Sequence, residues 1–279
     1  MSVTDMLKAI AVSSANDCAC AMAEHLAGSE GAFVSLMNKR AKELGMEHTN
    51  FVNCTGLDDD PEAANHRTCA HDIALMSRQL LVNHPDIKKF TTIWMDTMRN
   101  GTFGLANTNK MVRFYNGATG LKTGFTSGAG YCLSASAQRD GMELIAVVMG
   151  AESSKGRFAA CKSLLDYGFA NYALISPEVQ SQQVPVKLGI RSTVAAVPGE
   201  NPKLLIEKAQ QGDVKVEVKL DEQMTAPVSQ GQRLGTMTIR SGEQILTQIP
   251  MVAETAVQRL TWSQIFAKVL KRICMGEME

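Results

Sequence analysis

Apolar side chains recur every three or four positions over much of the first 170 residues, a spacing typical of amphipathic helices. The clearest stripe starts after Ser29 and ends at Gly45, and serine and glycine favour the start and the end of a helix. A second stripe starts at Thr68 and stops before Pro85, which cannot continue a helix. The pattern therefore predicts that the first part of the chain is largely helical.

The first 27 residues also have helical spacing, but a polar run interrupts them. Residues 13–17 are Ser-Ser-Ala-Asn-Asp, and Ser, Asn and Asp side chains compete with helical hydrogen bonds and favour caps and turns. The sequence therefore predicts two helices in this region, the second capped by Asp17 and ended by Gly28.

Shorter, strand-like runs follow in the middle of the chain. The Asn-Gly pair at 100–101 and the Arg-Asp-Gly run at 139–141 are turn signals. The runs 131–138 and 143–150 flank the second turn and predict a β-hairpin, and residues 118–124 predict the start of another strand. We therefore expect an antiparallel sheet in this region.

The pattern changes again after this sheet. Ser153 or Ser154 caps a predicted helix that extends toward Tyr172. Beyond it, apolar and polar residues alternate strictly over 214–220, which indicates a half-buried strand, and prolines are frequent. These features predict a small all-β domain over 174–254.

The last segment, 255–279, combines an apolar helical stripe with basic residues, and it holds no acidic residue before position 277. A terminal helix of this kind that carries Trp and Phe favours an anionic membrane interface over packing on a domain. The stripe comprises Trp262, Ile265, Phe266, Val269, Leu270 and Ile273.

Composition narrows the function classes without selecting one. The chain is 45% hydrophobic with 28 basic and 28 acidic residues, so its overall charge gives no reason to expect a nucleic-acid partner. No apolar run reaches the roughly 18 residues of a membrane-spanning helix, and the first residues lack the pattern of a secretory signal. The seven cysteines form no Cys-x-x-Cys motif, which predicts reduced, structural cysteines and no metal site or cofactor.

Two short motifs carry the candidate chemistry. Ser14-Ala15-Asn16 lies between two predicted helices, and Lys122-Thr123-Gly124 lies on a predicted strand that precedes a β-hairpin. Each motif alone is common at caps and strand ends. In this order and in these structural contexts, the two motifs together form a far more specific signature than either motif alone.

With these motifs, the chain resembles the low-molecular-mass penicillin-binding proteins, the serine D-alanyl-D-alanine carboxypeptidases of peptidase family S11. The run VSSANDCACAMAEHLAGSEGAFVSLMNKRAKELGM resembles the region of the family's Ser-x-Asn motif and the helix that follows. The run GATGLKTGFTSGAGYCLSASA resembles its Lys-Thr-Gly strand and hairpin. The resemblance covers essentially the whole chain, including the β-rich region and the amphipathic tail.

The family's first motif, Ser-x-x-Lys, does not occur among the 279 residues. In the family this motif supplies the acylating serine and its lysine base, and it precedes the Ser-x-Asn motif. Only 13 residues precede Ser14 here, so we expect a family member that lacks its N-terminal part and is inactive alone.

The resemblance assigns roles to the residues of the other two motifs. Ser14 would be the second catalytic serine, which passes a proton toward the leaving D-alanine nitrogen. Asn16 would orient the substrate amide. Lys122 and Thr123 would bind the terminal carboxylate of the substrate, and Gly124 would let the substrate backbone approach the strand. The backbone N–H of Phe125 would be an oxyanion donor.

Other candidate residues are explained better by structural roles. Asp72 matches an acidic position in the family, where a structural hydrogen bond is the expected role. Cys18 and Cys20 lie near Ser14, but both occupy positions where small core residues are expected, so a thiol nucleophile has little support.

The resemblance also implies a fold and partners. We expect an α/β (α+β) serine-transpeptidase/β-lactamase-like domain over 1–173, N-terminally incomplete, then the small all-β, sandwich-like domain over 174–254 and the amphipathic tail over 255–279. The implied partners are the D-Ala-D-Ala end of a peptidoglycan pentapeptide, β-lactams and a membrane surface, with no nucleic acid.

The implied location is the outer face of the cytoplasmic membrane, whereas the chain as written, without a signal, would stay in the cytoplasm. Two other interpretations remain: a peptidoglycan- or β-lactam-binding module without turnover, and a non-functional gene fragment. A β-lactamase or esterase fits less well because of the C-terminal β domain.

Overall fold

The computed structural model describes residues 1–59 and 61–274. The chain divides into two compact units, Met1–Ala170 and Asn171–Glu279.

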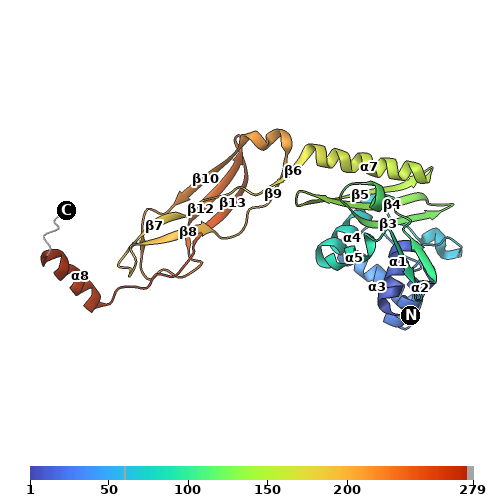
Figure 1. Ribbon diagram of the computed structural model, residues 1–279, viewed down its shortest axis with the longest axis horizontal. Coiled ribbons are helices and arrows are strands. Elements are labelled where there is room, and N and C mark those ends of the chain that lie inside the picture. Colours follow the sequence, from blue (N-terminus) through green and yellow to red (C-terminus); the bar gives the residue numbers. More distant parts are fainter. Residues whose placement is uncertain (60, 275–279) are drawn as a thin grey trace. The chain divides into compact units, whose positions relative to one another are not determined.

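A three-stranded antiparallel sheet forms the centre of the first unit. Its strands β3 (Ala118–Thr126), β4 (Gly130–Arg139) and β5 (Met142–Ala151) are adjacent in chain order. Helix α7 (Ser154–Asn171) lies on one face of this sheet, and helices α1, α4 and α5 lie on the other side (Figure 1). The sheet therefore separates two helical layers.

The remaining elements of the first unit are helices and one small hairpin, β1–β2. In chain order they are α1 (Val3–Ser13), α2 (Asn16–Ala27), α3 (Glu30–Glu43), the 3-10 turn Pro61–Asn65, α4 (Ala70–Asn83), the 3-10 turn Pro85–Ile87, α5 (Lys88–Thr91), β1 (Met95–Met98), β2 (Phe103–Ala106) and α6 (Met111–Phe114).

Local sequence signals determine several of these boundaries as predicted. The Ser29 hydroxyl accepts a hydrogen bond from the N–H of Ala32 at 3.2 Å and so caps α3. Gly28 ends α2 with φ +83°, a left-handed conformation that glycine adopts without a steric cost. The hairpin predicted around 139–141 is confirmed, because Asp140 and Gly141 both have positive φ and join β4 to β5.

Two predicted helix starts are wrong by one or two residues. Helix α2 begins at Asn16, so Asp17 lies in its first turn, where its carboxylate accepts from the Cys18 N–H at 2.9 Å. Helix α4, predicted to start at Thr68, begins after Cys69, whose sulfur accepts from the N–H of Asp72. The Thr68 hydroxyl lies outside the helix, 2.8 Å from the hydroxyl of Thr49, a contact between residues that are 19 positions apart.

The second unit is built from β-strands and ends in a helix. A six-stranded sheet has the order β10-β12-β13-β8-β7-β11, with only β11 and β7 parallel, and β6 pairs with β9 in a separate ribbon. The elements are β6 (Tyr172–Ile175), β7 (Gln182–Lys187), β8 (Thr193–Pro198), β9 (Leu204–Glu207), a 3-10 turn (Lys208–Asp213), β10 (Val214–Leu220), β11 (Met224–Thr225), β12 (Arg233–Ser241), β13 (Gln244–Ala253) and α8 (Trp262–Cys274).

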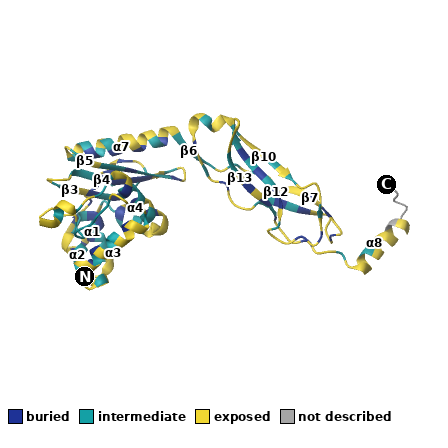
Figure 2. Cartoon of the chain, turned by 180° about the vertical axis from the view of Figure 1, so that it is seen from behind, coloured by how far each residue is buried: buried dark blue, intermediate teal, exposed yellow. Residues whose placement is uncertain are grey.

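This unit has a hydrophobic core of its own. Leu234, Met237 and Met251 are completely buried between its strands, and Figure 2 shows dark blue buried segments along β12 and β13. The strand predicted over 214–220 from the alternation of apolar and polar residues is confirmed as β10.

Helix α8 is different, because its apolar side chains are exposed. Trp262 is 87% exposed, Phe266 69% and Ile273 73%, and Figure 2 shows the helix mostly in the exposed class. Among the described residues, no helix combines the length and the apolar character needed to cross a membrane.

Candidate functional site

Ser14 occupies the short junction between α1 and α2. Its backbone has φ 60° and ψ 46°, a left-handed conformation that ends α1 and turns the chain into the next helix. Ser13 contributes to this ending, because its hydroxyl donates a hydrogen bond to the Ala9 carbonyl at 3.0 Å. The polar run that interrupts the helical pattern thus places the Ser14 hydroxyl at a helix end.

The structure brings the two predicted motifs into direct contact. Lys122 Nζ donates a hydrogen bond of 2.7 Å to Ser14 Oγ and another of 2.8 Å to the carbonyl of Thr123. Ser14 and Lys122 are 108 residues apart in the sequence, so only the fold accounts for this contact. The pair forms the polar centre of the candidate site.

The ammonium group of Lys122 is easier to deprotonate than an ordinary lysine. Burial, and to a smaller extent the nearby positive charge of Arg157, together lower its pKa from 10.5 to about 8. The cationic form therefore predominates at neutral pH and is lost as the pH rises above 8.

Arg157 is a functional candidate that the sequence motifs did not indicate. It lies on α7 and is 7% exposed, and its guanidinium donates to the carbonyls of Gly124 at 2.8 Å and Cys132 at 3.2 Å. The guanidinium also lies 5.4 Å from the centre of the Tyr131 ring. Arg157 thus connects helix α7 to the strand that carries Lys122, and no short motif marks it in the sequence.

The other predicted site residues differ in their exposure. Thr123 is buried, and its hydroxyl lies 2.7 Å from that of Thr108, whose backbone N–H donates to the Val12 carbonyl at 3.0 Å. This second link fastens the Lys-Thr-Gly strand to α1. Gly124 and Asn16 are exposed, so both can contact a ligand.

A cavity of about 420 Å³ adjoins the Lys-Thr-Gly strand. Residues of α4, β3, β4 and β5 line it, and the surface they present is mostly apolar, with Ile73, Leu80 and Val147 among them. The site therefore combines a partly buried cation, Lys122, with an apolar space beside it.

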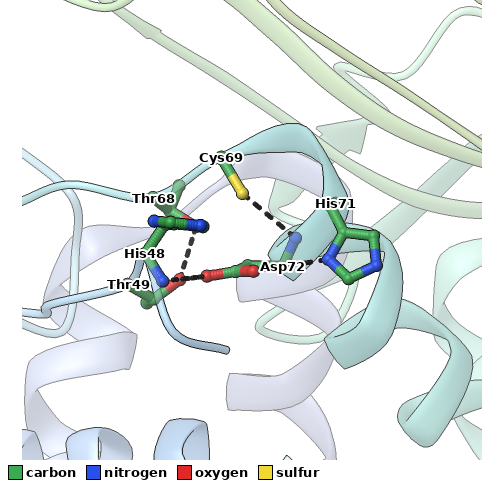
Figure 3. Close-up of polar contacts among 6 residues, drawn as sticks. All are labelled: His48, Thr49, Thr68, Cys69, His71 and Asp72. Atoms are coloured by element: carbon green, nitrogen blue, oxygen red, sulfur yellow. Dashed lines mark hydrogen bonds and ion pairs between the residues drawn. The ribbon is translucent and has the colours of Figure 1, made fainter. Parts of the chain in front are cut away.

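Asp72 of α4 is buried and is the centre of a hydrogen-bond network (Figure 3). Its carboxylate accepts hydrogen bonds from the backbone N–H of His48 at 2.9 Å and from the hydroxyl of Thr49 at 2.7 Å. These bonds tie the segment after α3 to the start of α4. The geometry agrees with the structural role expected for Asp72.

We expect Asp72→Asn to lower the melting temperature at pH 7 and to lose this effect in acid. Burial acts to raise the pKa of Asp72, but the hydrogen bonds from Thr49 and the His48 N–H outweigh it and keep the pKa below its usual value. The carboxylate thus stabilises the fold above the unfolded-state pKa of about 3.9, and this stabilisation is lost as the pH falls through the lower folded-state pKa.

Thermal melts of the wild type and of Asp72→Asn between pH 7 and pH 3 measure the difference in melting temperature. The difference between wild type and Asp72→Asn should shrink below about pH 4. Asp86→Asn, which removes an exposed partner of Lys89, should change the melting temperature little at any pH. A difference for Asp72→Asn that is equal at all pH values would contradict the prediction.

Comparison with known proteins gives two family matches. Residues 1–153 match a family model described as D-alanyl-D-alanine carboxypeptidase, Peptidase S11, and residues 169–259 match one described as the C-terminal domain of penicillin-binding protein 5. The D-alanyl-D-alanine carboxypeptidase DacF of Bacillus subtilis is 39% identical over 93% of this chain and 67% of its own length. The D-alanyl-D-alanine carboxypeptidase DacC of Escherichia coli is 33% identical over 92% of this chain and 64% of its own length. The chain thus spans about two thirds of the length of these relatives.

Solved structures give the same result for the fold. Penicillin-binding protein 5 of Haemophilus influenzae has a TM-score of 0.68 and 31% identity, covering 93% of this chain and 75% of that one. Penicillin-binding protein D2 of Listeria monocytogenes, solved in an ampicillin-bound form, has a TM-score of 0.56 and 36% identity over 61% of this chain and 68% of its own. The expected fold class, a helix-and-strand domain followed by a β domain, is confirmed.

Proposed function

The chain belongs to peptidase family S11, the D-alanyl-D-alanine carboxypeptidases, and on that premise we propose that its first unit binds the D-Ala-D-Ala end of a peptidoglycan stem peptide. The observation that supports this most strongly is the 2.7 Å hydrogen bond from Lys122 Nζ to Ser14 Oγ. It places one partly buried cation beside a hydroxyl group, as recognition of a terminal carboxylate next to a reacting amide requires.

The proposed roles follow from the chemistry of each group. Lys122 pairs with the terminal carboxylate, and the hydroxyl of Thr123 donates to the same group. Asn16 orients the substrate amide, and Gly124 lets the substrate backbone lie close to β3. Ser14 relays a proton toward the departing D-alanine nitrogen, because its oxygen already accepts a hydrogen bond from Lys122.

The complete reaction needs an acylating serine in addition. In the family the Ser-x-x-Lys motif supplies it, and the 279 residues contain no such motif. We therefore propose that this chain by itself binds peptide ends and β-lactams without turnover, whereas a protein that also carries the motif cleaves the terminal D-alanine through an acyl-enzyme. The N–H of Phe125 would then be one oxyanion donor.

Binding of a D-Ala-D-Ala peptide with a free carboxylate tests the proposal. Because the pKa of Lys122 is about 8, the ammonium fraction falls about tenfold for each further pH unit above that value. We expect the dissociation constant to be roughly thirtyfold higher at pH 9.5 than at pH 7. Isothermal titration calorimetry with the purified chain measures both values.

The same peptide amidated at its C-terminus is the matched control. It has no anion to pair with Lys122, so it should bind more weakly at pH 7 and show no comparable change between the two pH values. Equal affinities of the free-carboxylate peptide at pH 7 and pH 9.5 would exclude Lys122 as the carboxylate partner.

The separate roles of three segments of the chain are also a proposal. Residues 1–173 would form the catalytic part, 174–254 an accessory β domain and 255–279 a membrane-interface tail on the outer face of the cytoplasmic membrane. The tail proposal is supported by the exposed apolar residues of α8 and by the basic residues Lys268 and Lys271.

We expect Phe266→Ser to weaken binding of the chain to anionic phospholipid vesicles. An aromatic side chain that becomes buried in the lipid contributes about 1.5–3 kcal/mol to binding, so its loss corresponds to roughly a ten- to hundredfold lower partition coefficient. Cosedimentation with vesicles measures the effect. Ala267→Ser, a change beside the apolar stripe, is the control and should bind like wild type, and equal binding of Phe266→Ser would contradict the membrane role.

A further inference from the structure

Two cysteines and a glutamate meet where α2 packs against α3 and the loop that follows α3. Cys20 lies on α2, Glu30 is the first residue of α3, and Cys54 lies in that loop. The two Sγ atoms are 3.7 Å apart, and a carboxylate oxygen of Glu30 lies within 4.8 Å of both. All three residues are half-buried. We propose that they form a binding site for one Zn²⁺ ion.

The separation of the sulfur atoms fits this ion. Zinc–sulfur bonds are about 2.3 Å long, and two sulfurs at the corners of a tetrahedron around zinc are therefore about 3.8 Å apart. The observed 3.7 Å needs almost no adjustment. A disulfide needs a sulfur–sulfur distance of about 2.05 Å, so the two side chains would have to move much closer together.

The set of donor atoms also selects the kind of metal. Two thiolates with one carboxylate suit a borderline-soft ion such as Zn²⁺, whereas Mg²⁺ and Ca²⁺ prefer oxygen ligands throughout. Binding replaces the thiol protons of Cys20 and Cys54, so two protons are released for each ion bound. A water molecule completes the tetrahedron as the fourth ligand.

Hydrogen bonds to the backbone hold two of the three ligands, Glu30 and Cys54, in position before any ion binds. The N–H of Cys54 donates to the carboxylate of Glu30 at 3.0 Å. The preceding residue, Asn53, accepts from the N–H of Gly56 at 2.7 Å and donates to the Leu57 carbonyl at 3.0 Å, which closes the loop on itself. A preformed loop lowers the ordering cost of metal binding.

The loop is fastened to α3 at a second point. Asn38 donates from its side-chain amide to the Phe51 carbonyl at 2.7 Å and accepts from the Phe51 N–H at 2.8 Å. An ion held by Cys20 and Cys54 would extend this attachment to α2, the helix that begins directly after the Ser14 junction. The site therefore acts as a structural clamp on the element that places Ser14, and it does not depend on the proposed catalytic role.

Zinc titration of the reduced, metal-free 279-residue chain tests the site. In competition with a chromophoric chelator, we expect one Zn²⁺ per chain. A thiol reagent should then find two fewer reactive cysteines in the zinc-loaded protein than in the metal-free protein. Cobalt substituted for zinc should give a thiolate-to-metal charge-transfer band, and zinc should raise the melting temperature. These measurements use the wild-type chain, so they do not depend on whether a variant folds.

Variants then assign the ligands. Cys20→Ser and Cys54→Ser should each weaken zinc binding at least a hundredfold, and Glu30→Gln at least tenfold, with circular dichroism confirming that each variant is folded. Cys69→Ser is the matched control, since Cys69 is also half-buried but caps α4, and it should bind zinc like wild type. Zinc binding unchanged by both cysteine variants would overturn the proposal, as would a Cys20–Cys54 disulfide together with no zinc binding by the reduced chain.

Discussion

A fluorescent penicillin should leave the 279-residue chain unlabelled at pH 7. Acylation needs a serine hydroxyl whose proton a neighbouring base can take, and the hydroxyl of Ser14 faces a lysine that is mostly protonated at this pH. Loss of the nucleophile in a serine hydrolase lowers the rate by a factor on the order of 10⁶. Denaturing gel electrophoresis and intact-protein mass spectrometry both detect the expected absence of an adduct.

A chimera supplies the positive arm of this experiment. A segment that carries the family's Ser-x-x-Lys motif, joined to this chain, should give one penicillin adduct per molecule, located on the added serine. The same chimera with that serine changed to alanine is the control and should remain unlabelled. Stoichiometric acylation of the 279-residue chain, mapped to any of its residues, would refute the prediction.

In that chimera, Lys122→Ala should lower kcat/KM about ten- to hundredfold on a peptide that ends in D-Ala-D-Ala. A charge-assisted hydrogen bond contributes about 1.5–3 kcal/mol, and each 1.4 kcal/mol corresponds to a factor of ten. Lys122→Arg should restore only part of the activity, because a planar guanidinium does not reproduce a compact ammonium group. Steady-state kinetics of D-alanine release measure all three proteins.

Two comparisons separate this role from a structural one. The effect of Lys122→Ala should disappear on the C-terminally amidated peptide, which offers no carboxylate. Lys155→Ala removes an exposed lysine at the start of α7 and should leave kcat/KM unchanged. If Lys122→Ala had the same kcat/KM as the unmodified chimera on the free-carboxylate peptide, Lys122 would be an ordinary strand lysine.

Sequence reasoning succeeded where the cause of a structure is local. Ser29 caps α3 with its own hydroxyl, Gly28 ends α2, and the Asp-Gly pair at 140–141 turns a hairpin, all within a few residues of the chain. It was wrong where contacts with distant residues decide. The helix predicted to start at Thr68 begins after Cys69, and the Thr68 hydroxyl contacts that of Thr49, which nothing near Thr68 in the sequence indicates.

The candidate site shows the same limit. The contact between Ser14 and Lys122 spans 108 residues, and only the resemblance to a family suggested that the two motifs belong together. Arg157 and the group of Cys20, Glu30 and Cys54 could not be predicted at all. The two cysteines are 34 residues apart, and sequence reasoning considered only short, regular cysteine spacings, so it gave no sign that they lie close together. A site assembled from two helices and a loop has no such spacing.

The left-handed backbone of Ser14 also limits how this position can change during evolution. Threonine would keep the hydroxyl, but β-branched side chains are strongly disfavoured at φ 60°. Glycine and asparagine adopt this conformation readily, yet both discard the hydroxyl. Most single replacements at position 14 thus give up either the backbone geometry or the oxygen atom. Selection for the chemistry would keep serine here, and relaxed selection would favour drift toward glycine or asparagine.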